Sequence, residues 1–153
     1  MRYLVFLVLI LAYPASLFAY TDHIAVPIEE VWKASEEALK PYGIQKADQS
    51  KGVLESKWIQ EQVTRESLSL MKKFKFKKDY YRRLRIKILL KQTEYSTRVQ
   101  ITGTYMFRAV DAPWHGVWKK MKLKAEDRLR EQDFFYKILS NLEKSRTRLD
   151  SVS

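Results

Sequence analysis

The chain has 153 residues, of which 46% are hydrophobic and 31% charged, a balance that indicates one globular domain and excludes an intrinsically disordered chain. The formal net charge is +11, and cysteine is absent. The absence of cysteine is compatible with any compartment, but it excludes disulfides, cysteine nucleophiles, thiolate metal sites and lipidation at an N-terminal cysteine.

The N-terminal stretch MRYLVFLVLILAYPASLFA has the layout of a secretory signal peptide, with Arg2 ahead of an apolar run over residues 3–13. We expect cleavage after Ala19 and a mature domain of residues 20–153, in the periplasm or associated with the envelope. The alternative is an uncleaved membrane anchor, since the apolar length is near the lower limit for a span. Because an exported chain does not meet nucleic acid, we expect no nucleic-acid partner.

The mature chain is expected to begin with a short strand over residues 20–27. A helix is then predicted from about Pro27 to Lys40, because apolar and small side chains recur at helical spacing. These side chains are Ile28, Val31, Trp32, Ser35, Ala38 and Leu39. Proline suits the first turn of a helix, and Pro41 with Gly43 should end this one.

Two further short strands follow, over residues 44–48 and 53–60. The sequence QSKG between them supplies a turn, in which Gly52 can adopt a positive φ. Residues 61–79 leave two alternatives open. They extend two strands into a long hairpin, or they form a basic loop.

From Tyr80 the hydrophobic pattern alternates with a period of two, which predicts a strand with one buried and one solvated face. The inward side chains are Leu84, Ile86, Ile88 and Leu90, and the outward ones include Arg83, Arg85, Lys87 and Lys91. A second strand of this kind follows the turn QTEYS, with Val99, Ile101, Gly103, Tyr105 and Phe107 inward. The two strands are expected to pair as an antiparallel hairpin.

Residues 111–124 form a loop with two tryptophans, and a long helix is predicted over residues 125–146. Its apolar stripe contains Leu129, Phe135, Tyr136, Leu139 and Leu142, widened by Phe134 and Ile138. The element order predicts an α+β fold: a two-layer sandwich in which an antiparallel sheet of four to five strands packs on two helices, of the helix-grip or TATA-binding-protein-like type.

One segment resembles a known family. The run VWKASEEALKPYGIQKADQSKGVLESKWI, residues 31–59, is similar to the repeated domain of the C subunit of the Bam outer-membrane protein assembly machine. The shared positions are Trp32, Ala38, Leu39, Gly43, Asp48, Ser50 and Gly52. The resemblance implies a helix-grip domain and a link to outer-membrane assembly. The family differs in being a two-domain lipoprotein, whereas this chain has no cysteine and room for one such domain.

Catalytic chemistry is not readable in this sequence. His23 and His115 lack partners at the spacing of a metal site or an acid–base pair, and are expected to be surface residues. Neither a nucleophile elbow nor a glycine-rich phosphate loop is present. We therefore expect no enzyme, no cofactor and no metal.

The basicity is local, because residues 71–91 hold ten Lys or Arg against the single acid Asp79. Cations of one sign on neighbouring outward positions repel one another, which favours contact with an anion over plain solvation. The candidate anion- or membrane-binding residues are Lys72, Lys73, Lys75, Lys77, Lys78, Arg83, Arg85, Lys87 and Arg98. Plain solvation of an outward strand face is the alternative.

Aromatic residues accompany these cations, as is typical of a lipid headgroup interface. The candidate interfacial aromatics are Phe74, Phe76, Trp114 and Trp118. Phe74 and Phe76 could instead point into the core, and the tryptophans could form a lid over the open end of the sandwich. The sequence thus predicts an exported binding or scaffold protein that contacts an anionic envelope lipid or an acidic envelope protein. The alternative is a carrier that holds a small apolar ligand between the sheet and the C-terminal helix.

Overall fold

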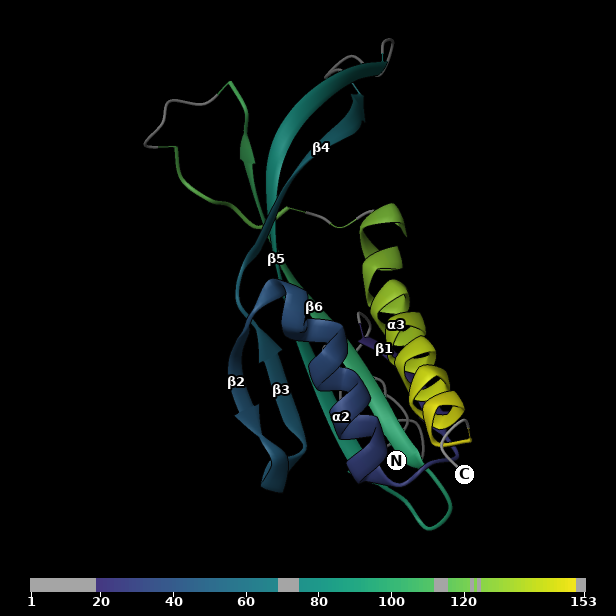
Figure 1. Ribbon diagram of the computed structural model, residues 1–153. Coiled ribbons are helices and arrows are strands. Elements are labelled where there is room, and N and C mark those ends of the chain that lie inside the picture. The colour runs from purple at the N-terminus through teal and green to yellow at the C-terminus, as the bar shows by residue number, and fades with distance from the viewer. Residues whose placement is uncertain (1–18, 69–74, 112–115, 122, 124, 151–153) are drawn as a thin grey trace, which may run out of the picture.

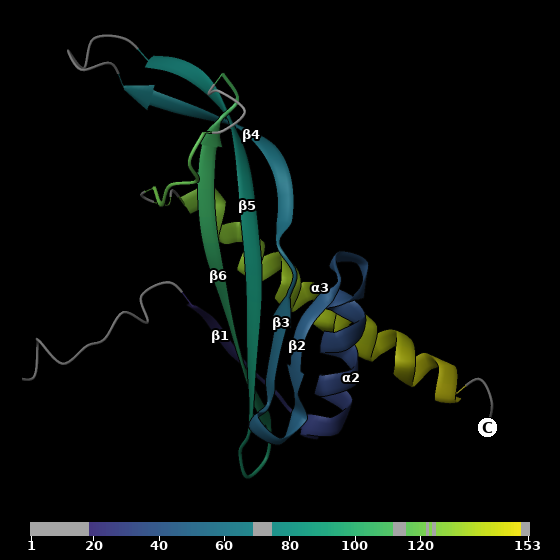
Figure 2. The same ribbon diagram turned by 90° about the vertical axis from the view of Figure 1, so that its left-hand side faces the viewer.

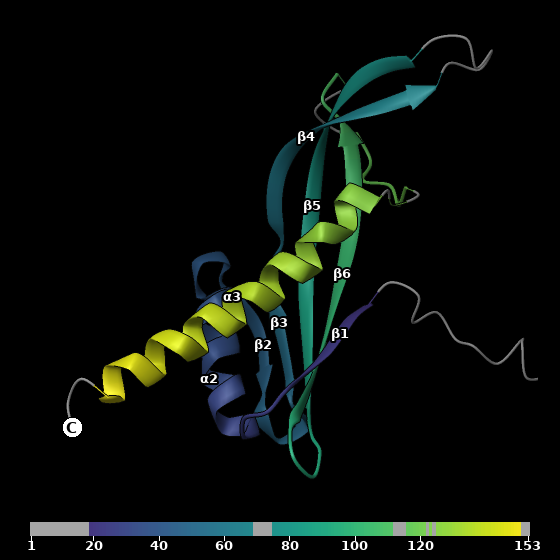
Figure 3. The same cartoon turned by 90° about the vertical axis from the view of Figure 1, so that its right-hand side faces the viewer.

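The computed structural model describes residues 19–68, 75–111, 116–121, 123 and 125–150. In chain order the elements are β1 (Ala19–Ile24), α2 (Ile28–Leu39), the 3-10 helix η1 (Lys40–Tyr42), β2 (Ile44–Asp48), the 3-10 helix η2 (Gln49–Lys51), β3 (Val53–Ser56), β4 (Ile59–Leu68), β5 (Lys75–Gln92), β6 (Thr97–Ala109) and α3 (Ala125–Asp150). The strands form one antiparallel sheet, and α2 and α3 cover the same side of it (Figure 1 and Figure 3). This is a two-layer α+β sandwich of the helix-grip type, as the sequence predicts.

The sheet runs in the order β1, β6, β5, β3, β2, and β4 also pairs with β5. β5 is the central strand. On one edge it pairs with β6 over residues 80–92. On the other edge it pairs first with β4, over residues 75–84, and then with β3, over residues 87–89.

The expected number of strands was too low, and the single strand expected over residues 53–60 is divided between β3 and β4. The division has a cause in local hydrogen bonding. The hydroxyl of Ser56 accepts from the backbone N–H of Ile86 at 2.9 Å. A side-chain oxygen thus replaces the backbone carbonyl that would accept this bond between regular β-strands. The N–H of Lys57 then donates to the carbonyl of Gly43 at 2.8 Å, which turns the chain away from β5. Within the described residues the sheet consequently has six strands.

Of the two alternatives for residues 61–79, the structure forms the hairpin. β4 and β5 pair in continuous register from Ile59 opposite Leu84 to Leu68 opposite Lys75. The paired strands rise past the helices as a curved arm (Figure 1 and Figure 2). Residues 69–74, which join the two strands, lie outside the described residues.

The predicted alternation in β5 and β6 is confirmed. The inward side chains of β5 are buried, and so are those of β6 apart from the half-buried Gly103; the buried set is Leu84, Ile86, Ile88, Leu90, Val99, Ile101, Tyr105 and Phe107. The predicted turn between β2 and β3 is also confirmed, with Gly52 at a φ of 63°. A side chain there would collide with the carbonyl of Leu90, which adds a packing reason for glycine.

Both helices bury one stripe against the sheet. In α2 the predicted stripe is confirmed for Val31, Trp32, Ser35, Ala38 and Leu39. Predicted Ile28 is half-buried, and Ala34, which was not predicted, is buried as well. The C-terminal end of α2 is also as expected, since the chain passes through η1 to Gly43 at a φ of 79°.

The predicted stripe of α3 is partly wrong. Leu129 and Tyr136 are 57% and 55% exposed. The side chains that α3 buries are Asp127, Glu131, Phe134, Phe135, Ile138 and Leu142. The helix is thus turned so that two acids face the sheet, because the sheet offers them arginine and tyrosine partners described below. None of the described helices is long and apolar enough to cross a lipid bilayer.

Candidate functional site

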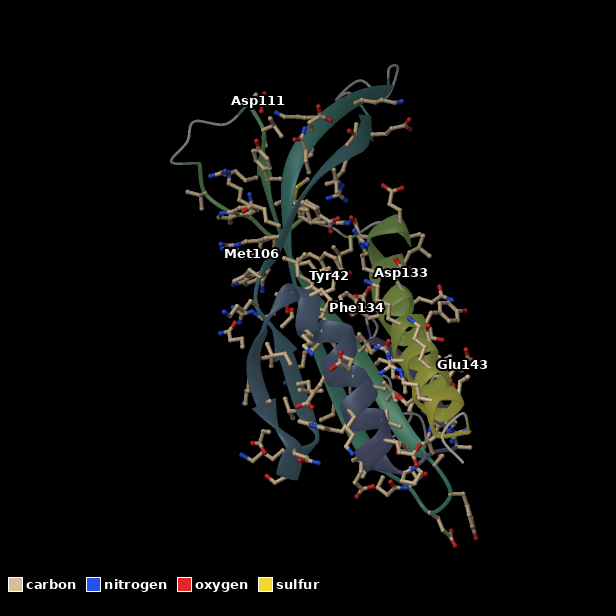
Figure 4. The ribbon with its side chains drawn as sticks, in the orientation of Figure 1. Tyr42, Met106, Asp111, Asp133, Phe134 and Glu143 are labelled. Atoms are coloured by element: carbon tan, nitrogen blue, oxygen red, sulfur yellow. The ribbon has the colours of Figure 1, made fainter. Side chains whose placement is uncertain are left out.

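The face of the sheet opposite the helices, here called the open face, carries the outward side chains of β5. Figure 2 views the molecule from this side, with the strands in front of α2 and α3. Arg83 lies opposite Met106 of β6, and Arg85 lies opposite Thr104. Met106 accordingly projects from the strands on the side away from α3 (Figure 4).

Two tryptophans from outside β5 and β6 stack on the arginines of this face. Trp58, in the connection between β3 and β4, has the guanidinium carbon of Arg85 at 4.4 Å from its ring centroid and that of Arg83 at 4.8 Å. Trp118 has Arg83 at 4.5 Å and Arg108 at 5.2 Å. Cations and indoles therefore alternate across the open face, and each contact is of the cation–π type.

The row ends on β5, where Arg108 lies 5.4 Å from the ring centroid of Tyr81. We call this row the Arg–Trp ladder; its members are Arg85, Trp58, Arg83, Trp118, Arg108 and Tyr81. All six side chains are half-buried. Because neighbouring guanidinium groups contact a shared ring, the ladder holds like charges in fixed positions and not on free side chains.

The guanidinium groups of Arg83 and Arg85 have no carboxylate partner among the described residues. A terminal nitrogen of Arg83 lies 3.5 Å from the sulfur of Met106, a weak acceptor. In both arginines the Nε atom is buried without a hydrogen-bond partner within the same residues. The Nε atom of Arg82, on the opposite face, is buried in the same way, so what distinguishes Arg83 and Arg85 is their stacking on tryptophan without a carboxylate partner among the described residues.

The other predicted cations divide between the open face and the arm. Lys87 is exposed opposite Glu55 of β3, and Arg98 is exposed opposite Lys91. Lys77 lies opposite Glu66 on the arm.

Lys78 has the opposite parity to Lys77 on β5, and its ammonium lies 3.3 Å from the carboxylate of Asp111. Opposite charges therefore meet on the arm and at the β3 edge, whereas the centre of the open face carries the ladder.

Some predicted site residues cannot be placed. Lys72, Lys73, Phe74 and Trp114 lie outside the described residues, as does His115. Lys75 and Phe76 belong to β5, but only their backbone is described.

Trp118 differs from the lid interpretation, because it stacks on the open face and does not close over the core. His23 is exposed, with Nδ1 at 3.3 Å from the hydroxyl of Ser96.

A second cluster of charge lies on the opposite face, buried between the arm and the start of α3. Arg82 donates to Asp127 at 2.9 Å and to Glu61 at 2.9 Å. Arg65 pairs with the other carboxylate oxygen of Asp127 at 3.2 Å, and Arg130 pairs with Glu61. Burial would raise the pKa of Glu61, but the hydrogen bonds from Arg82 and Arg130 hold this pKa below its ordinary value.

Glu131 extends this buried charge cluster one turn further along α3. Its carboxylate accepts from the hydroxyl of Tyr105 at 2.8 Å and from the backbone N–H of Gly103 at 3.2 Å. Burial raises the pKa of Glu131, and burial together with the neighbouring carboxylate raises the pKa of Tyr105. Every acid named here has a partner, so the cluster fits a structural clamp that holds α3 on the sheet.

The alternation rule could have located Arg82, which has the same parity as Leu84 and Ile86 and therefore faces the core. Asp127 and Glu131 are likewise four residues apart and continue the stripe of Phe134 and Phe135. No comparable sequence pattern predicted the ladder, because Trp58 and Trp118 join it from segments distant in the sequence.

Comparison with known proteins identifies no family. No protein-family model matches the chain, and no curated protein matches it. Solved structures similar to it include a DUF4468 family protein from Bacteroides ovatus ATCC 8483, with 14% identity and a TM-score of 0.47 over 81% of this chain and 85% of that chain. TTHA0849 from Thermus thermophilus has 14% identity and a TM-score of 0.32 over 82% of this chain and 93% of that chain.

Ara h 8.0201 has 13% identity and a TM-score of 0.36 over 84% of this chain and 95% of that chain. At these TM-scores the likenesses carry no argument about function. None of the three has a description that connects it with the Bam machine, so the resemblance of residues 31–59 stays a prediction.

Proposed function

We propose that this chain is an exported cell-envelope protein that binds an anionic surface or partner through the open face of its sheet. One observation carries the proposal: the guanidinium groups of Arg83 and Arg85 stack on tryptophan rings without an acidic partner among the described residues. The signal-peptide layout of residues 1–19 supports the location. A link to outer-membrane assembly follows from the resemblance alone.

The physical argument is one of preorganisation. A free arginine side chain loses rotamer freedom when it binds an anion, but a stacked one has already lost it on folding. Holding like charges close together costs electrostatic energy in the unbound protein, and an anion relieves that cost. The exposed cations Lys91 and Arg98 extend the same positive potential toward the β5–β6 turn.

The alternative function places an apolar ligand between the sheet and α3. Among the described residues that interface is occupied by Tyr105, Phe134, Phe135 and Ile138, each of them buried. We therefore favour the open face.

The test is cosedimentation of the purified full chain with vesicles of phosphatidylglycerol in phosphatidylcholine, and with phosphatidylcholine alone, over a series of salt concentrations. We expect binding to the anionic vesicles that weakens as salt rises, because exposed charges are screened. Neutral vesicles measure what the apolar N-terminus contributes. Equal binding to both compositions, or no binding to either at low salt, would contradict a role at an anionic lipid surface.

A further inference from the structure

We propose that the Arg–Trp ladder is a phosphate-binding site whose ligand is the phosphomonoester headgroup of a lipid in the envelope membrane. This inference rests on the proposed function and names the chemistry of its partner. The ladder selects the ligand, while the remaining cations of the basic surface attract anions without selectivity.

The arrangement of the guanidinium groups favours an anion with several oxygens. Arg83 and Arg85 both lie within 5 Å of the centroid of Trp58, so both guanidinium groups contact one indole ring. Arg83 and Arg108 likewise both contact the ring of Trp118. Neighbouring members of the ladder are thus close enough to act on one ligand.

Phosphate suits this spacing better than carboxylate. A guanidinium group binds either anion through two parallel hydrogen bonds. A carboxylate has two oxygens, and one guanidinium satisfies both. A phosphomonoester has three terminal oxygens and a charge between −1.5 and −2. It can therefore accept from Arg83 and from Arg85 at once.

A membrane surface suits the distribution of charge better than a single acidic segment does. The ladder draws its members from β5, β6, the β3–β4 connection and the segment of residues 116–121, so it spreads across the sheet in two dimensions. Exposed Lys87, Lys91 and Arg98 lie on the same face. Lysines and arginines near an anionic surface each contribute about 1 kcal/mol of attraction without a fixed geometry.

The experiment compares two anionic vesicles of equal measured surface charge. One contains phosphatidic acid in phosphatidylcholine, which presents phosphomonoesters, and the other contains oleic acid in phosphatidylcholine, which presents carboxylates. We expect the full chain to bind the phosphatidic acid vesicles about tenfold more tightly. Inorganic phosphate, titrated in solution, should bind weakly and compete at millimolar concentration. Such weak binding would show that the ligand is the lipid headgroup and not free phosphate.

Charge-conserving variants test the ladder itself. The double variant R83K/R85K keeps the net charge but removes the planar, stacked donors. We expect it to lose about tenfold in binding to phosphatidic acid vesicles and to bind both anionic vesicles alike. The matched control K33R/R146K changes two exposed cations on the helices, away from the open face, and its binding should stay within about twofold of the unaltered protein. Thermal unfolding checks that each variant is folded, and the single variant R85K serves if the double variant is not.

The outcomes separate this inference from the proposed function. If R83K/R85K binds phosphatidic acid vesicles as the unaltered protein does, the ladder is not the site, although an anionic surface is still bound. If the two anionic vesicles bind the unaltered protein equally, or if polyglutamate of equal charge displaces it from phosphatidic acid, the phosphate preference is wrong. If neither anionic vesicle binds, the proposed function fails as well.

Discussion

Arg82 and Arg83 are adjacent in sequence, and their side chains lie on opposite faces of the sheet because side chains alternate along a strand. Arg82 is 7% exposed and bonds two carboxylates, those of Glu61 and Asp127. Arg83 is half-buried between Trp58 and Trp118. The same residue type thus serves as a clamp on one face and as an available cation on the other, and the difference comes from the partners alone.

Asp127→Asn should strongly destabilise the protein. Asp127 is 2% exposed and neutralises two buried guanidinium groups, those of Arg65 and Arg82. Removing one member of a buried ion pair costs about 3–5 kcal/mol, because the remaining charge stays buried. The control is Asp111→Asn, because the side chain of Asp111 is 73% exposed in its pair with Lys78, and about 1 kcal/mol or less is expected. Equal values from urea denaturation of the two variants would contradict the clamp.

The two glutamates of the buried charge cluster should give opposite pH dependences of stability. The pKa of Glu61 is lowered, so its contribution is present above the ordinary value of 4.5 and is lost as pH falls. The pKa of Glu131 is raised, so its contribution is present below 4.5 and is lost as pH rises through the raised pKa.

Unfolding free energies of the unaltered protein, E61Q and E131Q, measured from about pH 3.5 to about pH 7, would check this pair of signs. The advantage of the unaltered protein over E61Q should grow with rising pH, and its advantage over E131Q should shrink. Slopes of the same sign would show that the assignment of these two carboxyls is incorrect.

At the scale of elements, the docking of α3 is the feature that the sequence predicted least well. A count of apolar residues selects a stripe with Leu129 and Tyr136, both of which are exposed. The observed stripe begins with Asp127 and Glu131, because their carboxylates meet arginines and a tyrosine on the sheet. Hydrophobic periodicity cannot detect a helix face that is partly ionic. The strands were predictable because their buried face is almost wholly apolar.

Gly103→Ala tests the contact between β6 and α3. A Cβ at this position would lie 2.7 Å from the carboxylate of Glu131 and would also meet the ring of Tyr105. Overpacking of this kind costs about 1–3 kcal/mol. The neighbouring Thr104 is exposed on the other face, so Thr104→Ala should stay within about 0.5 kcal/mol. A negligible effect of Gly103→Ala on the thermal midpoint would mean that α3 is held less closely than described.

At the scale of the whole molecule, the two faces of the sheet differ in how charge is balanced. The helix side pairs its buried arginines with acids, and the open face stacks Arg83, Arg85 and Arg108 on indoles. The local excess of cations was visible in the sequence, and so was the outward position of Arg83 and Arg85. The ladder was not, because it depends on Trp58 and Trp118 arriving from separate connections.

Export predicts a defined N-terminus. If the leader is cleaved after Ala19, β1 loses the pair of Ala19 with Thr102 and keeps those from Tyr20 to Ile24. The exported protein should therefore begin at Tyr20 by intact-mass measurement and unfold as cooperatively as the longer chain. A mass that includes residues 1–19, together with recovery in the membrane fraction, would favour the anchor over the cleaved leader.

The most direct test of binding at the open face is NMR of the arginine Nε–H groups during titration with small phosphatidic acid bicelles. Those of Arg83 and Arg85 are buried and should exchange slowly enough to be observed. We expect their signals to shift before and further than that of exposed Arg98, while the signal of Arg82 stays fixed. Shifts at Arg98 without shifts at Arg83 and Arg85, or no shift in any of them, would contradict it.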